Sequence, residues 1–543
     1  MATRVYRCSP TSFELARTYI EIHMKEHDRS VIKEYLTEDE PFGPIDASEV
    51  GDARALQVLF EHHNKIYRAL HKRPSIVVGR KGSGKTSYLN SVFFEGRYKH
   101  MAQLEAAETF SKVISSISDA SAGVMFSESV AKVWENVLYI GLFGNVRNDL
   151  DKGSTARNYI NDYLAKLGIR EGDTLEDILW QITDVIAERG KDKPHGILAE
   201  ILRTLDNVSF KKAKEELVLY LKSKDAMAVI LLDSLDDFQL HLDAVSRAIQ
   251  GLLKFVGESN KPSSSIDIRL CLPAELYHKF QSVSSNPNKD FRRKLTLHWV
   301  ASELVMVASH RLNMYLWAHN LPGYIDFKGR DEKRAARSLL ESIMPSTITS
   351  KLDTEEDSLA YILRHTQLLP RHLLIIMNSI HDQAKRQNGG YALSYSDQAI
   401  RKGVSAVEET IVQEIFVAFK PTYPLAEQVC SQCIPELYHK FSIGDLERVF
   451  RTHGKKAAES DDFFDFKRML IETGVIGRVL EDTDRYILAE FEYTTSHKLV
   501  TSTDDLLCIH PLFTEVFSAK IREKKPVYPY GSRIEDRDYR SLD

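Results

Sequence analysis

The clearest apolar run in the first half of the chain is 227–232, which contains no polar residue. A strand with this pattern is buried on both faces, as in a parallel sheet. Further short strands are predicted at 75–78, 266–272 and 295–299. The spacing of apolar residues after the run 227–232 predicts a helix over about 240–257. Strands that alternate with helices predict an α/β fold, a parallel sheet with helices on both faces.

The same pattern divides the chain into parts. Helical spacing continues without a strand pattern from the end of the predicted sheet to about residue 415. The C-terminal quarter combines helices with a predicted β-hairpin at 475–493, which favours a winged-helix-like domain. The predicted parts are an N-terminal helical extension and linker (1–50), a core (51–300) with a helical insertion at about 100–225, a helical lid (301–415), the winged-helix-like domain (416–525) and a poorly ordered tail (526–543).

Composition narrows the class of protein. A chain of 543 residues with 43% hydrophobic and 27% charged residues is typical of a globular protein of roughly three domains. It has no run of about 18 apolar residues and no apolar leader, so we expect no membrane span and a cytoplasmic protein. Five cysteines predict no disulfide framework, and Cys430 and Cys433 are interpreted as incidental helix cysteines rather than a zinc site.

The octapeptide Gly-Arg-Lys-Gly-Ser-Gly-Lys-Thr at 79–86 matches the P-loop pattern G-x-x-x-x-G-K-[ST] at every fixed position. Its glycines let successive backbone N–H groups point inward at a phosphate, and the following helix adds the positive end of its dipole. Lys85 can reach the β- and γ-phosphates of ATP, and the Thr86 hydroxyl can bind Mg²⁺. The residues assigned to the nucleotide are Gly79, Arg80, Lys81, Gly82, Ser83, Gly84, Lys85, Thr86 and Ser87.

A P-loop needs a carboxylate at the end of a neighbouring strand to hold Mg²⁺. Asp233 directly follows the apolar strand 227–232 and is the candidate for this role, together with Thr86. The acidic pair Asp236 and Asp237 can orient or deprotonate the attacking water, with Asp236 preferred. The alternative is that both only cap the following helix.

These two motifs resemble those of the signalling and KAP-like P-loop ATPases. That group is found in prokaryotic antiviral and stress systems and is related to the AAA+ and origin-recognition ATPases. The resemblance extends over about 42–517. Phe42-Gly43 resembles the N-terminal lead-in of the group, Leu369-Pro370-Arg371 the Pro-Arg motif of its lid, and Ile509-His510-Pro511 the close of its C-terminal domain. The resemblance implies an ATPase core with a lid and a winged-helix-like domain.

The resemblance also implies roles for two arginines. Arg371 would contact the γ-phosphate from the lid as a sensor of the nucleotide, and the alternative is an ordinary arginine on a helix surface. Arg293, next to Arg292, stands where relatives place an arginine finger that reaches a neighbouring subunit. The alternative for this pair is a solvated basic patch. Two departures are Leu272 at the end of the sensor strand, where relatives carry a polar residue, and an interval of 148 residues between Lys85 and Asp233, which implies a helical insertion.

Charge bears on whether the winged-helix-like domain binds DNA. Residues 425–525 contain 14 Lys and Arg against 18 Asp and Glu, and both the helix start at 461–465 and the turn at 481–484 are acidic. Such a surface repels phosphate, so contact with protein is favoured over contact with DNA. The basic runs at 451–456 and 522–525 keep the DNA alternative open.

The expected function is a Mg²⁺–ATP-dependent switch with slow hydrolysis. We expect a homo-oligomer that also engages a separate effector protein subunit, by resemblance in antiviral defence. One alternative is a DNA-dependent ATPase that resembles replication-initiation or transposition factors. Another is a scaffold that holds nucleotide without turnover, since Ser234 stands where an acidic neighbour of Asp233 is missing.

Overall fold

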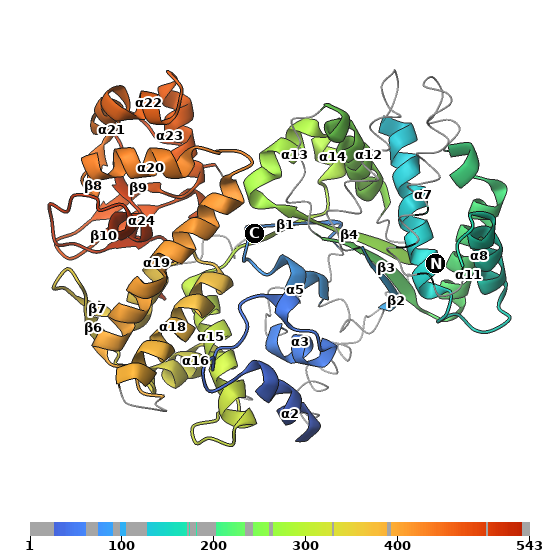
Figure 1. Cartoon of the computed structure of the whole chain (residues 1–543), viewed down its shortest axis with the longest axis horizontal. Coiled ribbons are helices and arrows are strands. Elements are labelled where there is room, and N and C mark those ends of the chain that lie inside the picture. Colours follow the sequence, from blue (N-terminus) through green and yellow to red (C-terminus); the bar gives the residue numbers. More distant parts are fainter. Residues whose placement is uncertain are drawn as a thin grey trace, which may run out of the picture.

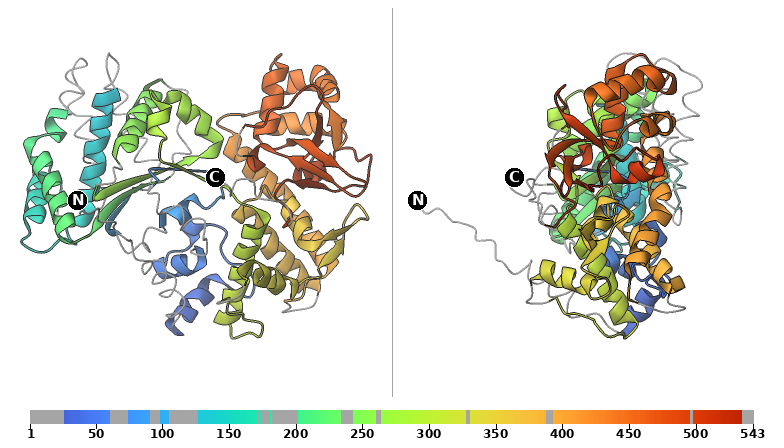
Figure 2. Two further views of the ribbon diagram at one scale, coloured as in Figure 1. Left: turned by 180° about the vertical axis from the view of Figure 1, so that it is seen from behind. Right: turned by 90° about the vertical axis from the view of Figure 1, so that its left-hand side faces the viewer.

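The protein consists of a central α/β core with helices at one end and a lid with a C-terminal domain at the other (Figure 1). The view from behind shows the same arrangement, with the N-terminal helices beneath the core and beside the lid (Figure 2). The computed structural model describes residues 26–60, 74–90, 98–104, 127–170, 173, 177, 181, 202–233, 243–259, 264–327, 331–387, 393–495 and 498–534.

The core is built on a sheet of five parallel strands, counted over the described residues, in the order β2-β3-β4-β1-β5. The register pairs Val78 of β1 with Leu272 of β4 and with Thr296 of β5. All five strands therefore end at the same edge of the sheet, and the loop after β1 lies at that edge. The strands are β1 (Ile76–Gly79), β2 (Tyr98–Leu104), β3 (Met227–Leu232), β4 (Ile266–Pro273) and β5 (Lys294–Leu297).

Alternate residues of these strands face opposite layers. One face of the sheet, which includes Ile230 and Leu270, forms a buried apolar cluster with α7 and α12. The other face carries Val77 and Leu231, which pack with Tyr88 from the helix after the P-loop. This burial on both faces is why the strands are apolar at successive positions. The core helices are α5 (Lys85–Asn90), α7 (Ser127–Val146), α8 (Thr155–Lys166), α11 (Val208–Ser223), α12 (Asp243–Ser259), the short turn η3 (Ala274–Leu276), α13 (Tyr277–Val283) and α14 (Pro287–Asp290). The helix α3 (Ala53–Phe60) instead buries its apolar residues in the cluster of the lid.

The lid and the N-terminal segment share a second and larger apolar core. Leu36 and Phe42 of the N-terminal segment are fully buried in it with residues of α15, α18 and α19. The segment before the P-loop is therefore anchored on the lid. The elements are α2 (Glu26–Tyr35), the short turn η1 (Ala47–Glu49), α15 (Ala301–Ala318), α16 (Glu332–Glu341), β6 (Thr347–Thr349), β7 (Glu355–Asp357), α17 (Ser358–Arg364), α18 (Pro370–Gln387) and α19 (Asp397–Phe419).

The C-terminal domain is winged-helix-like and packs its helices against a second sheet, of order β12-β10-β9-β11-β8. The predicted hairpin is present as β9 and β10, which pair antiparallel. The elements are α20 (Ala426–Cys433), η4 (Ile434–Glu436), β8 (Lys440–Ser442), α21 (Ile443–Val449), η5 (Phe450–Gly454), α22 (Lys455–Ala457), α23 (Phe463–Glu472), β9 (Ile476–Asp482), β10 (Ile487–Glu490), η6 (Glu492–Thr494), β11 (Leu506–Ile509), α24 (Pro511–Val516) and β12 (Val527–Pro529).

Four strands lie where the sequence predicted other structure. Residues 98–104, expected to enter the helical insertion, form β2 at the edge of the core sheet and pair with β3. The lid, expected to be helical throughout, contains the antiparallel pair β6 and β7. The expected tail contributes β12, whose three residues are buried and pair with β10. The helices α7, α8 and α11 do lie between β2 and β3 in the chain, where the helical insertion was predicted.

None of the helices in the described part of the chain is long and apolar enough to cross a membrane.

Candidate functional site

The octapeptide runs from the last residue of β1 through a loop into the first two residues of α5, and it turns sharply at two glycines. Gly82 has φ 82° and Gly84 has φ 90°. Side chains other than glycine rarely adopt these angles, so the glycines allow a tight turn into the helix that begins at Lys85. A Cβ atom on Gly79 would lie 2.3 Å from Ser83 Oγ, so the two ends of the loop are in close contact.

Lys85 and Ser83 lie inside this loop. The Lys85 side chain is buried, and its Nζ donates to the Gly79 carbonyl at 3.1 Å. The buried Ser83 hydroxyl has no hydrogen-bond partner among the described residues. On the outside, Trp299 Nε1 donates to the Ser83 carbonyl at 2.9 Å and holds the loop against the end of β5. The loop is thus fixed in place, and within the described part of the chain the Lys85 ammonium group has only backbone oxygens as hydrogen-bond partners.

Thr86 and Asp233 are brought together by α5 and β3. The Thr86 hydroxyl donates to Asp233 Oδ2 at 2.7 Å, and Asp233 is buried directly beyond the end of β3. A hydroxyl and a carboxylate at this distance have the oxygen donors that Mg²⁺ prefers. Ser87, the next residue of α5, is half-buried.

The first turn of α18 in the lid touches the P-loop. The Arg371 backbone N–H donates to the Gly82 carbonyl at 3.4 Å. A Cβ atom on Gly82 would lie 2.9 Å from Arg371 Cβ, so only glycine allows the lid this close. The Arg371 guanidinium forms an ion pair and hydrogen bond with Asp46 of the N-terminal segment.

Residues 36–46, which we call the lead-in, run along one face of α18. Positions 371, 378 and 385 are seven apart, so they share a face of the helix. Burial lowers the pKa of His381, so its neutral ring donates from Nε2 to the Glu38 carbonyl. In order along α18, Arg371 pairs with Asp46, Asn378 accepts from the Phe42 N–H at 3.2 Å and donates to the Gly43 carbonyl at 3.0 Å, His381 contacts Glu38 at 2.9 Å, and Lys385 donates to Asp39 at 2.5 Å.

The second and third residues of the octapeptide interact with Glu275, in the turn after β4. Glu275 Oε1 accepts the Lys81 backbone N–H at 2.9 Å and lies 3.9 Å from Arg80 Nε. The Lys81 side chain is exposed. Burial lowers the pKa of Arg80, and the charge of Glu275 opposes that shift.

The structure does not place the remaining predicted site residues, Asp236, Asp237 and Arg293, beside the P-loop: the first two are not described, and the third lies away from it. Asp236 and Asp237 fall outside the described residues. Arg293 lies just before β5, and its carbonyl accepts the Ser75 N–H at 2.9 Å. Ser75 precedes β1, so Arg293 is at the edge of the sheet opposite the P-loop and cannot reach the loop of its own chain. Leu272 is fully buried in β4.

Sequence reasoning did not find three residues that shape the site: Asp46, Glu275 and Trp299. Glu275 follows one predicted strand and Trp299 is the last residue of another, both at the edge where the P-loop lies, so strand order was the available signal. Asp46 had no local signal, because its partner on α18 is 325 positions away.

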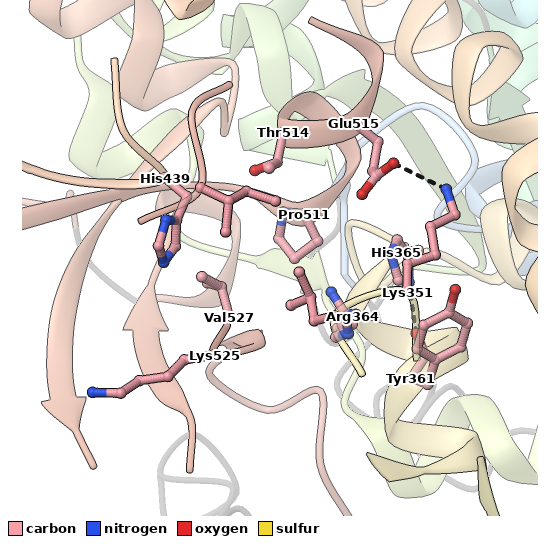
Figure 3. A pocket seen from close by; sticks show the side chains of 12 residues that line it. Lys351, Tyr361, Arg364, His365, His439, Pro511, Thr514, Glu515, Lys525 and Val527 are labelled. Atoms are coloured by element: carbon pink, nitrogen blue, oxygen red, sulfur yellow. Dashed lines mark hydrogen bonds and ion pairs between the residues drawn. The ribbon is translucent and has the colours of Figure 1, made fainter. Parts of the chain in front are cut away.

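A second feature is a small cavity of about 30 Å³ between the lid and the C-terminal domain (Figure 3). This volume has room for about one water molecule. Figure 3 shows Lys351, which donates to Glu515 at 2.9 Å, on one side and His439 on the other. The cavity is lined by Lys351, Leu352, Tyr361, Arg364, His365, His439, Pro511, Thr514, Glu515, Ile521, Lys525 and Val527.

The cysteine pair carries no visible site. Cys430 and Cys433 are both buried on α20. Within the described residues, no group of three or more His, Cys, Asp or Glu side chains is arranged to hold a metal ion.

No family model matches the chain, and no curated protein matches it significantly. Three solved structures align over most of its length. The Aeropyrum pernix ORC2 protein in its ADPNP–ADP complexes is 13% identical, with a TM-score of 0.39, over 87% of this chain and 92% of that one. Cdc6p from Pyrobaculum aerophilum is 12% identical, with a TM-score of 0.25, over 89% and 99%, and the ADP form of the A. pernix ORC2 protein is 11% identical, with a TM-score of 0.26, over 84% and 90%. Likenesses this weak assign no role to any residue.

Proposed function

We propose that the chain is a P-loop ATPase that acts as a Mg²⁺–ATP-dependent switch. The observation that carries the proposal is the contact between the P-loop and the lid at Gly82 and Arg371. A nucleotide bound in the loop would lie where two parts of the molecule meet, so its phosphates would affect both.

The residues of the loop fit a triphosphate and its metal. Lys85 would exchange its backbone oxygen partners for phosphate oxygens, and the backbone N–H groups around Gly82 and Gly84 would donate to them. Thr86 and Asp233 would hold Mg²⁺, which neutralises developing phosphate charge. Asp236 or Asp237 would orient or deprotonate the attacking water.

The switch requires contacts that differ between nucleotide states. A ligand shifts a conformational equilibrium only by its difference in affinity for the two states. We propose that Arg371 leaves Asp46 for the γ-phosphate when ATP binds, and returns after hydrolysis. The lead-in and the lid would then change their contact with each turnover.

Self-assembly would complete the site. Arg293 lies at the far edge of the sheet from its own P-loop, so any action on a nucleotide would have to be on that of a neighbouring copy. We propose that ATP promotes a homo-oligomer in which this arginine stabilises transition-state charge in trans. Engagement of a separate effector protein would follow from the same assembly.

The test is ATP hydrolysis by the purified chain with Mg²⁺. Lys85→Ala is expected to abolish turnover and binding, and Asp236→Ala to slow turnover while ATP still binds. Normal turnover in the Asp236 variant would move the water-activating role elsewhere, and normal turnover in the Lys85 variant would refute the proposed site. Native mass measurement with and without ATP tests the assembly.

Charge pairing favours a protein partner over DNA. Many cations on the helices of the C-terminal domain are paired with acids: Arg448 with Asp445, Arg451 with Glu447, Lys455 with Asp461, and Arg468 with Asp465. Such cations have less charge to offer to phosphates. Duplex DNA that stimulates hydrolysis, with an affinity that falls steeply as salt is added, would instead support a DNA-dependent ATPase.

The proposed setting in antiviral defence rests on the resemblance alone. Phage challenge of cells that express the chain tests it, with Lys85→Ala as the inactive control. Equal phage sensitivity with both chains would count against this setting.

A further inference from the structure

Arg80 is a P-loop residue whose side chain contacts the lid and the C-terminal domain. Its Nη2 donates to Gln367 Oε1 at 2.5 Å, just before α18. Its guanidinium lies 5.3 Å from the centre of the Tyr493 ring and 5.7 Å from that of Phe419. The side chain is only 14% exposed. A buried guanidinium that loses its partners carries a large cost in free energy. Any movement of the Arg80 side chain is therefore expected to carry its contacting side chains with it.

Gln367 extends this contact into the C-terminal domain. Its side chain is buried, and Nε2 donates to the Thr473 carbonyl at 3.0 Å, at the end of α23. The next residue, Gly474, has φ 74°, and a Cβ atom there would lie 2.7 Å from Gln367 Nε2. The amide therefore bridges the P-loop arginine and the C-terminal domain at a point that admits no side chain.

Tyr493 forms a second connection between Arg80 and the C-terminal domain. Its hydroxyl lies 2.8 Å from His510 Nε2, beyond the end of β11. His510 Nδ1 accepts the Leu512 N–H at 3.2 Å, and burial lowers the pKa of His510 to about 3, so the ring is neutral and Nε2 carries the proton. His510 thus donates to Tyr493 and fixes the ring beside Arg80.

We propose that Arg80 transmits the state of the P-loop to the winged-helix-like domain through Gln367 and Tyr493. Arg80 is adjacent in sequence to the residues that would close around phosphate, so a change in the loop backbone shifts its guanidinium. The Gln367 amide and the Tyr493 ring, which contact this guanidinium, would shift with it. Because Gln367 is bonded to Thr473 and Tyr493 to His510, the C-terminal domain would respond to the shift. This inference rests on the proposed nucleotide binding and assigns the route by which that binding reaches the C-terminal domain.

The test compares hydrogen–deuterium exchange of the full chain with and without Mg²⁺–ATP. In the wild type, ATP is expected to change exchange at 473–495 and 506–512. Arg80→Met keeps an unbranched side chain of similar length but donates no hydrogen bond. At an ATP concentration that saturates this variant, the response of those segments is expected to be lost. Arg386→Ala removes an arginine of α18 that is 70% exposed, and it should leave both binding and response unchanged.

A second variant tests the link from the other end. Gly474→Ala would displace Gln367 without touching the loop. Because coupling between two sites is reciprocal, it is expected to change ATP affinity by about five-fold or more. This variant also keeps the test decisive if Arg80→Met does not fold, which thermal unfolding would reveal.

The outcomes separate this inference from the proposed function. A wild type that binds no ATP refutes the proposed function. A wild type that binds ATP with no change at 473–495 refutes the Arg80 route alone, as does an Arg80→Met chain that keeps the full response. Unchanged ATP affinity in Gly474→Ala would also overturn the route.

Discussion

Glu408 is a buried carboxyl group on α19 at the junction of the lid and the C-terminal domain. Its Oε1 lies 3.6 Å from His365 Nε2, and its Oε2 lies 3.8 Å from Lys351 Nζ. Burial raises its pKa to about 7, Lys351 and Arg364 oppose the shift, and the charge of Glu515 adds to it. The carboxyl group therefore stays protonated in the folded chain at pH values where the unfolded chain has lost the proton.

The size of the effect follows from the two pKa values. A pKa of about 7 in the fold against an ordinary 4.5 is worth about 3 kcal/mol. Because the folded-state pKa is the higher one, this stabilisation is present below pH 4.5 and is lost as the pH rises to 7. Glu408→Gln mimics the protonated group, so its advantage over the wild type should grow from about 1 kcal/mol at pH 5 to about 3 kcal/mol at pH 8.5.

Denaturant unfolding followed by tryptophan fluorescence measures this advantage, since Trp299 and Trp317 lie at the start of the lid and within it. Glu409→Gln is the matched control, because Glu409 is the next residue and is exposed. We expect the control to track the wild type at both pH values. A Glu408→Gln advantage that is the same at pH 5 and pH 8.5 would refute the reasoning.

Three further predictions concern named contacts. Asp46→Asn removes the anion held by Arg371 and should tighten Mg²⁺–ATP binding by up to about five-fold, as measured by titration calorimetry; weaker binding would contradict the exchange of partners. Gly82→Ala places a Cβ at φ 82°, against the lid, and should cost about 1–3 kcal/mol in thermal unfolding and weaken ATP binding. Glu356→Leu leaves the buried Arg364 without the carboxylate that lies 2.9 Å away and should cost about 3–5 kcal/mol in denaturant unfolding; a cost below about 1 kcal/mol would show that the pair contributes little.

The strands that carry the P-loop and Asp233 could be predicted from the sequence, because their apolar runs are continuous and buried on both faces. β2 could not, since its residues Tyr98–Leu104 mix polar and apolar positions at the edge of the sheet. β12 was not predictable from the sequence for a different reason. It is only Val527–Pro529, follows a run of charged residues, and is buried through pairing with β10.

The candidate site was predictable only where the signal is local. The P-loop pattern of the octapeptide indicates a turn followed by a helix. Thr86 does lie beside Asp233, and their shared role as metal ligands stays a prediction. The contacts of Arg80 with Gln367 and Tyr493 were not predictable. They depend on how the lid and the C-terminal domain pack around the loop, which no spacing within one segment encodes.

The central claim is that the P-loop binds ATP with Mg²⁺. Titration calorimetry of the purified chain with ATP tests it most directly, with Mg²⁺ and then with the metal chelated. Lys85→Ala is the site variant, and Lys289→Ala, an exposed lysine of the core, is the control. We predict saturable binding by the wild type and the control that weakens without Mg²⁺, and none by Lys85→Ala. Binding that is equal in the wild type and in Lys85→Ala would contradict the account.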